Sequence, residues 1–135
     1  FTIFGVIDVT ESGAANEAVL GRLGNDEFRL YRGSSSSEAR LRANGVNYDL
    51  SLSSPLPTGK FLFTVSRSAS GSINLRINST QQANTSSDVT NLFDFNRLGN
   101  GSTDSIMYEI AIYNVELNSA LRDEIEANII TRNGL

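Results

Sequence analysis

The first hundred residues alternate apolar and polar side chains with a period of two, and turn residues interrupt this alternation about every eight to twelve positions. One stretch shows it well, because Ile73, Leu75 and Ile77 alternate with Asn74 and Arg76. Such alternation is typical of a strand with one buried face. Since no helical pattern separates the strands, a parallel α/β fold is excluded. The pattern predicts an all-β antiparallel sandwich or jelly roll.

The individual strands are bounded by turn signals. Asn44-Gly45, between two alternating runs, is the strongest hairpin signal in the chain. Residues 53–59 contain both prolines and are predicted to be a crossing loop, and residues 84–91 a polar loop. Residues 1–9 carry apolar side chains at both odd and even positions, so this strand is predicted to be covered on both faces. The predicted strands are 1–9, 18–23, 27–32, 39–43, 46–52, 60–67, 72–78, 92–99 and 105–113.

One amphipathic helix is predicted at the end of the chain, over residues 119–132. Asn118 or Ser119 can cap its start, and Gly134 provides a left-handed stop. A helix this short must pack on the sandwich to be stable. Its narrow apolar face is predicted to consist of Leu121, Ile125 and Ile129.

The polar residues of this helix are predicted to face solvent: Asp123, Glu124, Glu126 and Arg132. On the preceding strand, Glu109 is expected to accept backbone N–H bonds or to pair with an arginine. Tyr108 and Tyr113, among isoleucines of the same strand, are expected to pack in the core or against the helix.

Composition excludes several kinds of chemistry. The chain has no histidine and no cysteine, so Ser–His–Asp and Cys–His catalysis and histidine- or thiolate-ligated metal sites are impossible. Carboxylates are the only plausible acid–base groups. The net charge of −4 and the scattered basic residues argue against nucleic acid as a partner. No apolar run approaches the ~20 residues that a membrane span requires, so no membrane insertion is expected.

Several segments, taken in order, resemble one known family. They are "FTIFGVIDVT", "VLGRLGNDEFRLYR", "TVSRSASGSINLRINSTQQ", "FDFNRLGNGST" and the closing "IMYEIAIYNVELNSALRDEIEANIITRNGL". Together they resemble the laminin-G-like domains of the concanavalin A-like lectin/glucanase superfamily, although Ser79 stands where the family has a glycine. The resemblance implies a jelly-roll β-sandwich with one short C-terminal helix, of a kind carried on bacterial surface proteins and phage tail fibres.

The resemblance also bears on domain organisation. Residues 1–135 are predicted to be one laminin-G-like domain. The family has an additional strand before "FTI", so we expect the sequence to be a fragment of a longer protein that lacks its first strand. Either an upstream segment supplies that strand or the chain is a trimmed fragment. A missing strand would leave a sheet edge exposed.

Glucanases of the superfamily place acids on one strand in the pattern Glu-x-Asp-x-x-Glu, and this chain has no such run. Glu109 has no acid at position 107 or 111. A glycosidase needs two carboxylates that flank the glycosidic bond, so the sequence predicts a module without enzymatic activity.

A ligand site is predicted where cationic and aromatic residues share a sheet face. Arg29, Arg40 and Arg42 fall at alternate positions and can lie on one face with Tyr31. Tyr48 is the second candidate platform for a sugar ring. An ordinary solvated face explains the same alternation equally well.

Oxygen-rich loops offer a possible calcium site at Asn25, Asp26, Asn100 and Asp104. Their spacing matches no known calcium cage, and a turn-forming role explains them equally well. No other cofactor is expected.

Two classes of function are left open. The first is a carbohydrate- or receptor-binding module on an extracellular or virion appendage, with a glycan or cell-surface receptor as partner. The second is a structural module that forms homo-oligomers or packs on other domains of its parent chain, with no ligand of its own.

Overall fold

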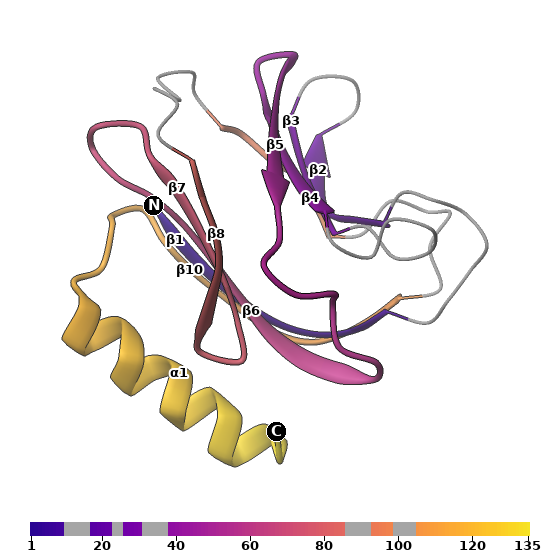
Figure 1. Ribbon diagram of the computed structural model, residues 1–135, viewed down its shortest axis with the longest axis vertical. Helices are drawn as coiled ribbons and strands as arrows, with labels where there is room; N and C mark the ends of the chain where they lie inside the picture. The colour runs from indigo at the N-terminus through magenta and orange to yellow at the C-terminus, as the bar shows by residue number, and fades with distance from the viewer. Residues whose placement is uncertain (10–16, 23–25, 31–37, 86–92, 99–104) are drawn as a thin grey trace.

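The computed structural model describes residues 1–9, 17–22, 26–30, 38–85, 93–98 and 105–135. They form two five-stranded antiparallel sheets, and helix α1 (Ser119–Asn133) lies outside them (Figure 1). The first sheet has the order β10-β1-β6-β7-β8 and the second β5-β4-β3-β2-β9. The strands are β1 (Thr2–Val9), β2 (Glu17–Arg22), β3 (Asp26–Leu30), β4 (Glu38–Ala43), β5 (Val46–Ser51), β6 (Lys60–Arg67), β7 (Ile73–Ile77), β8 (Thr80–Thr85), β9 (Arg97–Leu98) and β10 (Ser105–Tyr113). The prediction of an all-β antiparallel architecture closed by one helix is confirmed.

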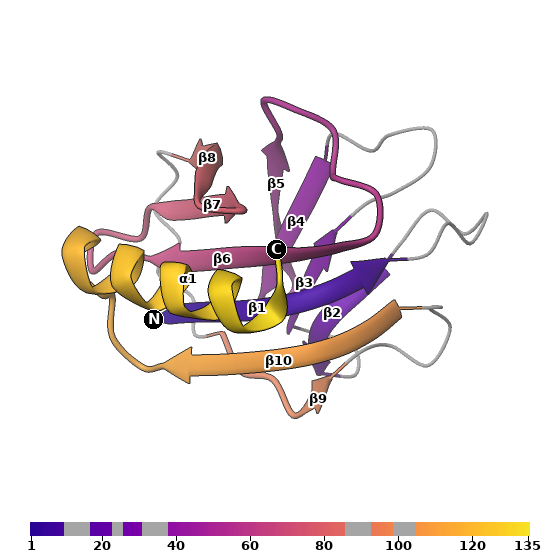
Figure 2. The same cartoon turned by 90° about the horizontal axis from the view of Figure 1, so that it is seen from below.

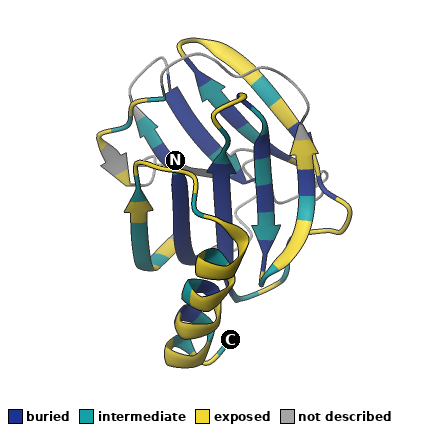
Figure 3. Ribbon diagram, turned by 90° about the vertical axis from the view of Figure 1, so that its left-hand side faces the viewer, coloured by how far each residue is buried: buried dark blue, intermediate teal, exposed yellow. Residues whose placement is uncertain are grey.

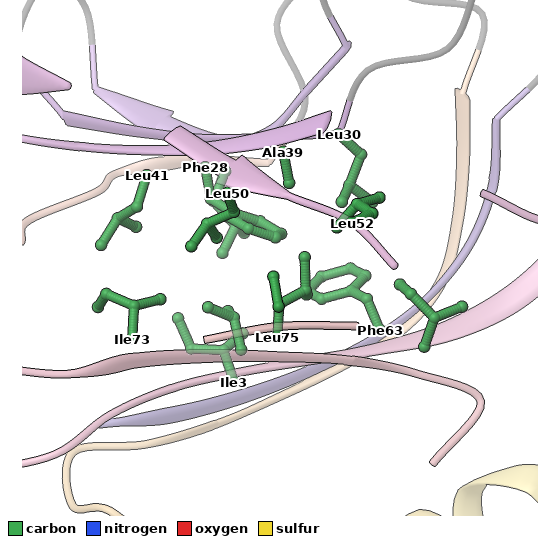
Figure 4. Packing of buried hydrophobic residues seen from close by; sticks show 14 of the residues in the cluster. Ile3, Phe28, Leu30, Ala39, Leu41, Leu50, Leu52, Phe63, Ile73 and Leu75 are labelled. Atoms are coloured by element: carbon green, nitrogen blue, oxygen red, sulfur yellow. The ribbon is translucent and has the colours of Figure 1, made fainter. Parts of the chain in front are cut away.

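The main core fills the space between the two sheets. Alternate side chains of each strand point inward, as the burial of β4 and β7 shows. Phe28 of the second sheet meets Phe63 of the first, with ring centroids 5.4 Å apart. Figure 4 shows Ile3, Phe63, Ile73 and Leu75 facing Phe28, Leu30, Ala39, Leu41 and Leu50 across this layer.

Strand β1 is buried on both faces, as its sequence predicts. Ile3 and Ile7 belong to the main core, whereas Phe4 and Val6 belong to a second cluster beneath the helix. Between them, Gly5 lets the Phe63 ring lie against the backbone, because a Cβ there would come within 2.3 Å of that ring.

Two turns use left-handed backbone conformations. Asn44 and Gly45 have φ of 49° and 80°, so the predicted hairpin between β4 and β5 is confirmed. Asn78 and Ser79 have φ of 46° and 64° and join β7 to β8. Ser79 therefore adopts a conformation that glycine adopts most easily, at the position where the family resemblance expects glycine.

Two predictions of secondary structure near the middle of the chain were wrong. Residues 80–83 lay outside every predicted strand and 84–91 were predicted to be loop, yet β8 covers Thr80–Thr85. This strand is polar because it lies at the sheet edge, and among its described side chains only Ala83 belongs to the main core. Conversely, of the strand predicted over 92–99, the described residues 93–98 contain only β9, and the backbone N–H of Asp94 donates to the buried Asp26 carboxylate.

Helix α1 packs over the outer face of β1 and β6 (Figure 2). The Asn118 side chain accepts from the Leu121 N–H at 3.0 Å, and Gly134 closes the helix in the left-handed conformation. Ile129 is buried against Phe4 and Val6. Figure 3 shows the exposed outer side of the helix and the buried strands beneath it.

The prediction that Glu126 faces solvent was wrong. Glu126 is fully buried, and its Oε2 lies 3.0 Å from Nη2 of Arg76 on β7. Leu121, predicted to be apolar contact surface, is 42% exposed. The buried stripe keeps Ile129 and the partly buried Ile125 but is rotated away from Leu121 toward Glu126. The charge on Arg76 accounts for the rotation, because a buried carboxylate needs a paired cation.

The C-terminal end of the helix is held by polar contacts. The Lys60 ammonium donates a hydrogen bond to the Asn133 carbonyl. Its positive charge there also interacts favourably with the negative end of the helix dipole. Glu109 accepts from the Arg132 guanidinium and, at 2.7 Å, from the Asn133 amide. The prediction that Glu109 pairs with an arginine is confirmed.

The two tyrosines of β10 differ. Tyr113 packs edge-on against Phe4 with ring centroids 5.9 Å apart, which confirms its predicted place against the helix. Tyr108 was predicted to be internal but is 50% exposed, and Lys60 Nζ lies 5.2 Å from its ring centroid. A bulge explains this, because Val6 pairs with Glu109 and Ile7 with Met107, so that Tyr108 is the extra residue.

We predict that Gly5→Ala destabilises the fold by about 1–3 kcal/mol, because the added methyl overlaps a Phe63 ring already packed on Phe28. Urea denaturation measures the change. Gly21→Ala is the matched control, since among the described residues its Cβ would come no closer than 3.7 Å to a neighbour, the Asp26 carbonyl oxygen. Equal stability losses in the two variants would contradict the proposed contact.

We predict that breaking the Arg76–Glu126 pair from one side, by Arg76→Leu or Glu126→Leu, costs about 3–5 kcal/mol, because an unpaired charge remains buried. The double variant should regain most of this loss, since Arg76 Nε and Glu126 Oε1 are buried without a hydrogen-bond partner among the described residues. A double-mutant cycle by urea denaturation measures the coupling. Arg122→Gln, which removes a more exposed pair with Asp123, should cost only about 0.2–1 kcal/mol.

We predict that Glu109 makes stability depend on pH. The hydrogen bond from Arg132 is the main cause that holds the pKa of Glu109 below its ordinary value of 4.5. A lowered folded-state pKa stabilises the fold above the unfolded pKa, and this stabilisation is lost as pH falls through the folded pKa. Glu109→Gln should therefore lower the urea midpoint at pH 7, and the gap to the parent should narrow toward pH 2. Glu124→Gln, on the exposed side of the helix, should show no such narrowing.

Candidate functional site

The outer face of the second sheet carries three arginines. On β3 and β4 the apolar residues point into the core, so that Arg29, Arg40 and Arg42 point outward. The strand register pairs Arg29 with Arg40 and Glu27 with Arg42. On the other side of β4, Arg40 pairs with Asp49 of β5. We call this surface, formed by Arg29, Arg40, Arg42, Glu27 and Asp49, the arginine face.

Ion pairs connect the side chains of the arginine face. Glu27, only 8% exposed, contacts both Arg29 through Nε and Arg42 through Nη1, the latter at 3.5 Å. Arg40 contacts Asp49 through Nε. The three arginine side chains are 22–34% exposed, whereas Asp49 is 64% exposed. Planar guanidinium groups that remain accessible beside carboxylates can donate to the hydroxyls and carboxylates of a sugar.

The two predicted aromatic platforms do not join these arginines among the described residues. Tyr48 pairs in register with Leu41 and packs against the main core, on the opposite side of the sheet from the arginine face. Tyr31 lies outside the described residues. The structure therefore brings together Arg29, Arg40 and Arg42 but places Tyr48 elsewhere.

Asp26, one of the four predicted calcium ligands, is buried and bound to backbone. Its Oδ1 accepts from the Asn44 N–H and its Oδ2 accepts from the Asp94 N–H at 3.0 Å. The carboxylate thus ties the β4–β5 turn to the segment before β9. Asn25, Asn100 and Asp104 lie outside the described residues. Within the described ranges, no group of three or more acidic residues is placed to hold a metal ion.

Three acidic residues of the described segments are each paired with at least one arginine. Glu109 is held by Arg132, Glu126 by Arg76, and Glu27 by arginines of its own sheet. The hydrogen bond from Arg132 holds the pKa of Glu109 below its ordinary value. A general acid would instead need a raised pKa.

A second candidate site, which the sequence did not predict, lies at one end of the first sheet. Two hollows of about 570 and 270 Å³ are both lined by Phe1, Arg67 and Asn114. The Arg67 guanidinium lies 5.3 Å from the Phe1 ring centroid, and the Phe1 and Phe93 rings are 5.5 Å apart. The lining residues come from segments that are far apart in the sequence, so no local motif predicts this site.

No helix in the described part of the chain has the length and apolar character of a membrane span.

Comparison with known proteins gives one finding, and it concerns the fold. No family model matches the chain, and no curated protein matches it. Three solved chains do match. One of them, the crystal structure of a mutant of HCR/D, aligns with a TM-score of 0.68 and 12% identity. The alignment covers 96% of this chain and 37% of that chain, and at this identity it shows similarity of fold alone.

Proposed function

We propose that this chain is a laminin-G-like jelly-roll domain of the concanavalin A-like superfamily that binds a carbohydrate or a glycan-bearing receptor without catalysis. We place it on an extracellular or virion appendage, such as a bacterial surface protein or a phage tail fibre. The ordered resemblance of its segments to that family supports the assignment. The two antiparallel sheets, the packed terminal helix and the shared fold of the HCR/D mutant agree with it.

The single observation that carries the binding function is the arginine face. Helix α1 covers the outer face of β1 and β6 in the first sheet, whereas on the outer face of the second sheet the polar side chains of β4 are accessible. That face presents Arg29, Arg40 and Arg42 at neighbouring positions of the strand register. Several hydrogen-bond donors fixed on rigid strands suit recognition of sugar hydroxyls, because little conformational entropy is lost on binding.

A second candidate function is assembly with another copy of the same chain. Strand β10 is at the edge of the first sheet, and Ile106, Tyr108 and Ile112 on it are each at least 50% exposed. An exposed edge strand with large apolar residues can pair with a second chain.

We predict that the isolated domain binds at least one glycan class on a broad immobilised panel. Arg42→Gln should lose this binding because it removes donors from the arginine face, whereas Arg122→Gln, with the same charge change on the helix, should retain it. Circular dichroism and light scattering on the same samples verify folding and mass. Silence across the panel together with a dimeric mass would favour the assembly function, and silence from a monomer would contradict both.

A further inference from the structure

The turn between β4 and β5 consists of an asparagine followed by a glycine. Asn44 and Gly45 join the two strands, and the register pairs Ala43 with Val46 on either side of them. Both turn residues are exposed, as are Val46 and Asn47 after them. Strand β5 is the last strand of the second sheet, so among the described residues no further strand covers its outer edge. The turn can therefore change conformation locally without opening the core.

The side chain of Asn44 and the backbone nitrogen of Gly45 are neighbours that can react with each other. Attack of this nitrogen on the Asn44 side-chain amide closes a small ring within one molecule, which removes the entropic cost of bringing two reactants together. Within the described part of the chain, neither the Asn44 side chain nor the Gly45 N–H has a hydrogen-bond partner. A Cβ on residue 45 would meet no described atom within 4 Å, so the nitrogen is open to its surroundings.

From this arrangement we infer that Asn44 is a site of spontaneous covalent modification, with water as the only other reactant. The Gly45 nitrogen bonds to Cγ of Asn44 and closes a succinimide ring. The side-chain nitrogen leaves as ammonia and takes the proton that the backbone nitrogen loses. Water then adds to one of the two ring carbonyls and breaks its bond to nitrogen, which gives aspartate or isoaspartate without oxidation or reduction. The inference goes beyond the proposed glycan-binding function and does not depend on it.

The same dipeptide occurs at the end of helix α1, where its contacts oppose the reaction. The Asn133 amide donates to Glu109 Oε2 at 2.7 Å and to the Ile129 carbonyl at 3.0 Å. The Gly134 N–H donates to carbonyls of the last helical turn. Because these hydrogen bonds must break before the ring can close, reaction at Asn133 should be slower than at Asn44 by about tenfold or more.

The isoaspartate product would change the turn that fixes the register of β5. Its main chain runs through Cβ and Cγ of residue 44, so the turn gains one methylene group. The two-residue turn holds Ala43 opposite Val46, and this register places Leu50 in the main core. A longer turn should therefore weaken the pairing of β5 with β4. Since β5 also carries Asp49, the modification would alter the arginine face as well.

Peptide mass spectrometry of the chain during incubation at mildly alkaline pH tests the inference. Exchange of ammonia for water should accumulate at Asn44, whereas Asn133 should react more slowly by about tenfold or more. The chain unfolded in urea is the reference, because there both asparagines simply precede a glycine and should react at similar rates. Equal rates at the two positions in the folded chain, or an inert Asn44 while the unfolded chain reacts, would overturn the inference.

Two variants test the reasons for the difference. Glu109→Ala removes an acceptor of the Asn133 amide, so it should speed reaction at Asn133 by about tenfold and leave Asn44 unchanged. Asn44→Gln keeps the amide but would have to close a larger ring, so reaction at this position should be lost. An unchanged rate at Asn133 would overturn its protection by these contacts, and continued reaction in Asn44→Gln would overturn the succinimide mechanism.

Asn44→Asp is the matched control for the effect on β5, because it adds the same charge without the methylene group. Chromatography isolates the isoaspartate form, and hydrogen exchange at the backbone amides of Val46–Ser51 measures the pairing of β5. The isoaspartate form should exchange these amides faster than Asn44→Asp by about fivefold or more, as the loss of one hydrogen bond would cause. Equal exchange in the two forms would overturn the effect on β5.

Discussion

Burial of β1 and β6 on both faces is the constraint on which the rest of the structure depends. Phe61, Phe63 and Val65 of β6 enter the main core, while Leu62 joins Phe4 and Val6 beneath the helix. A sheet with apolar side chains on both faces needs two covers. The second sheet is one and helix α1 is the other, which explains why a β-sandwich ends in a single helix.

The helix cover is more polar than its sequence indicates. The contact between the helix and the first sheet combines Ile129 with the Arg76–Glu126 ion pair. Lys60 and Glu109 add hydrogen bonds at the C-terminal end of the helix. Apolar packing alone would leave the short helix free to rotate about its axis or slide along β1 and β6. A buried ion pair and end contacts allow fewer positions, because any shift leaves a desolvated charge without its partner. We interpret these polar contacts as fixing the orientation of the helix as well as stabilising it.

Local pattern was sufficient for the strands and the helix, but the exceptions depended on tertiary partners. Nothing near Glu126 in sequence indicates that Arg76, fifty residues earlier, will receive it. The Asp94 N–H, in a segment that was predicted to be strand, likewise meets Asp26, which lies sixty-eight residues away in the sequence. Strand β8 was missed because a sheet edge exerts little hydrophobic selection on its residues.

The placement of Tyr48, by contrast, could have been predicted. A two-residue turn at Asn44-Gly45 fixes Ala43 opposite Val46 and therefore Leu41 opposite Tyr48. Since Leu41 faces the core, Tyr48 must face it too. The same reasoning places Arg40 opposite Asp49 on the outer face, so the ion pair between them could have been predicted from the strand register.

In the proposed function the two sheets have different roles, because the first sheet holds the helix and the second presents the arginine face. In the first sheet, helix α1 covers the outer face of β1 and β6, and polar residues of that sheet hold the helix in place. The second sheet has β3 at its centre and keeps Glu27 buried among arginines on its outer side. A buried carboxylate that two arginines share orients both guanidinium groups before any ligand arrives. Preorganisation of this kind reduces the entropic cost of binding, so in the proposed function the buried Glu27 prepares Arg29 and Arg42 to donate hydrogen bonds to a sugar.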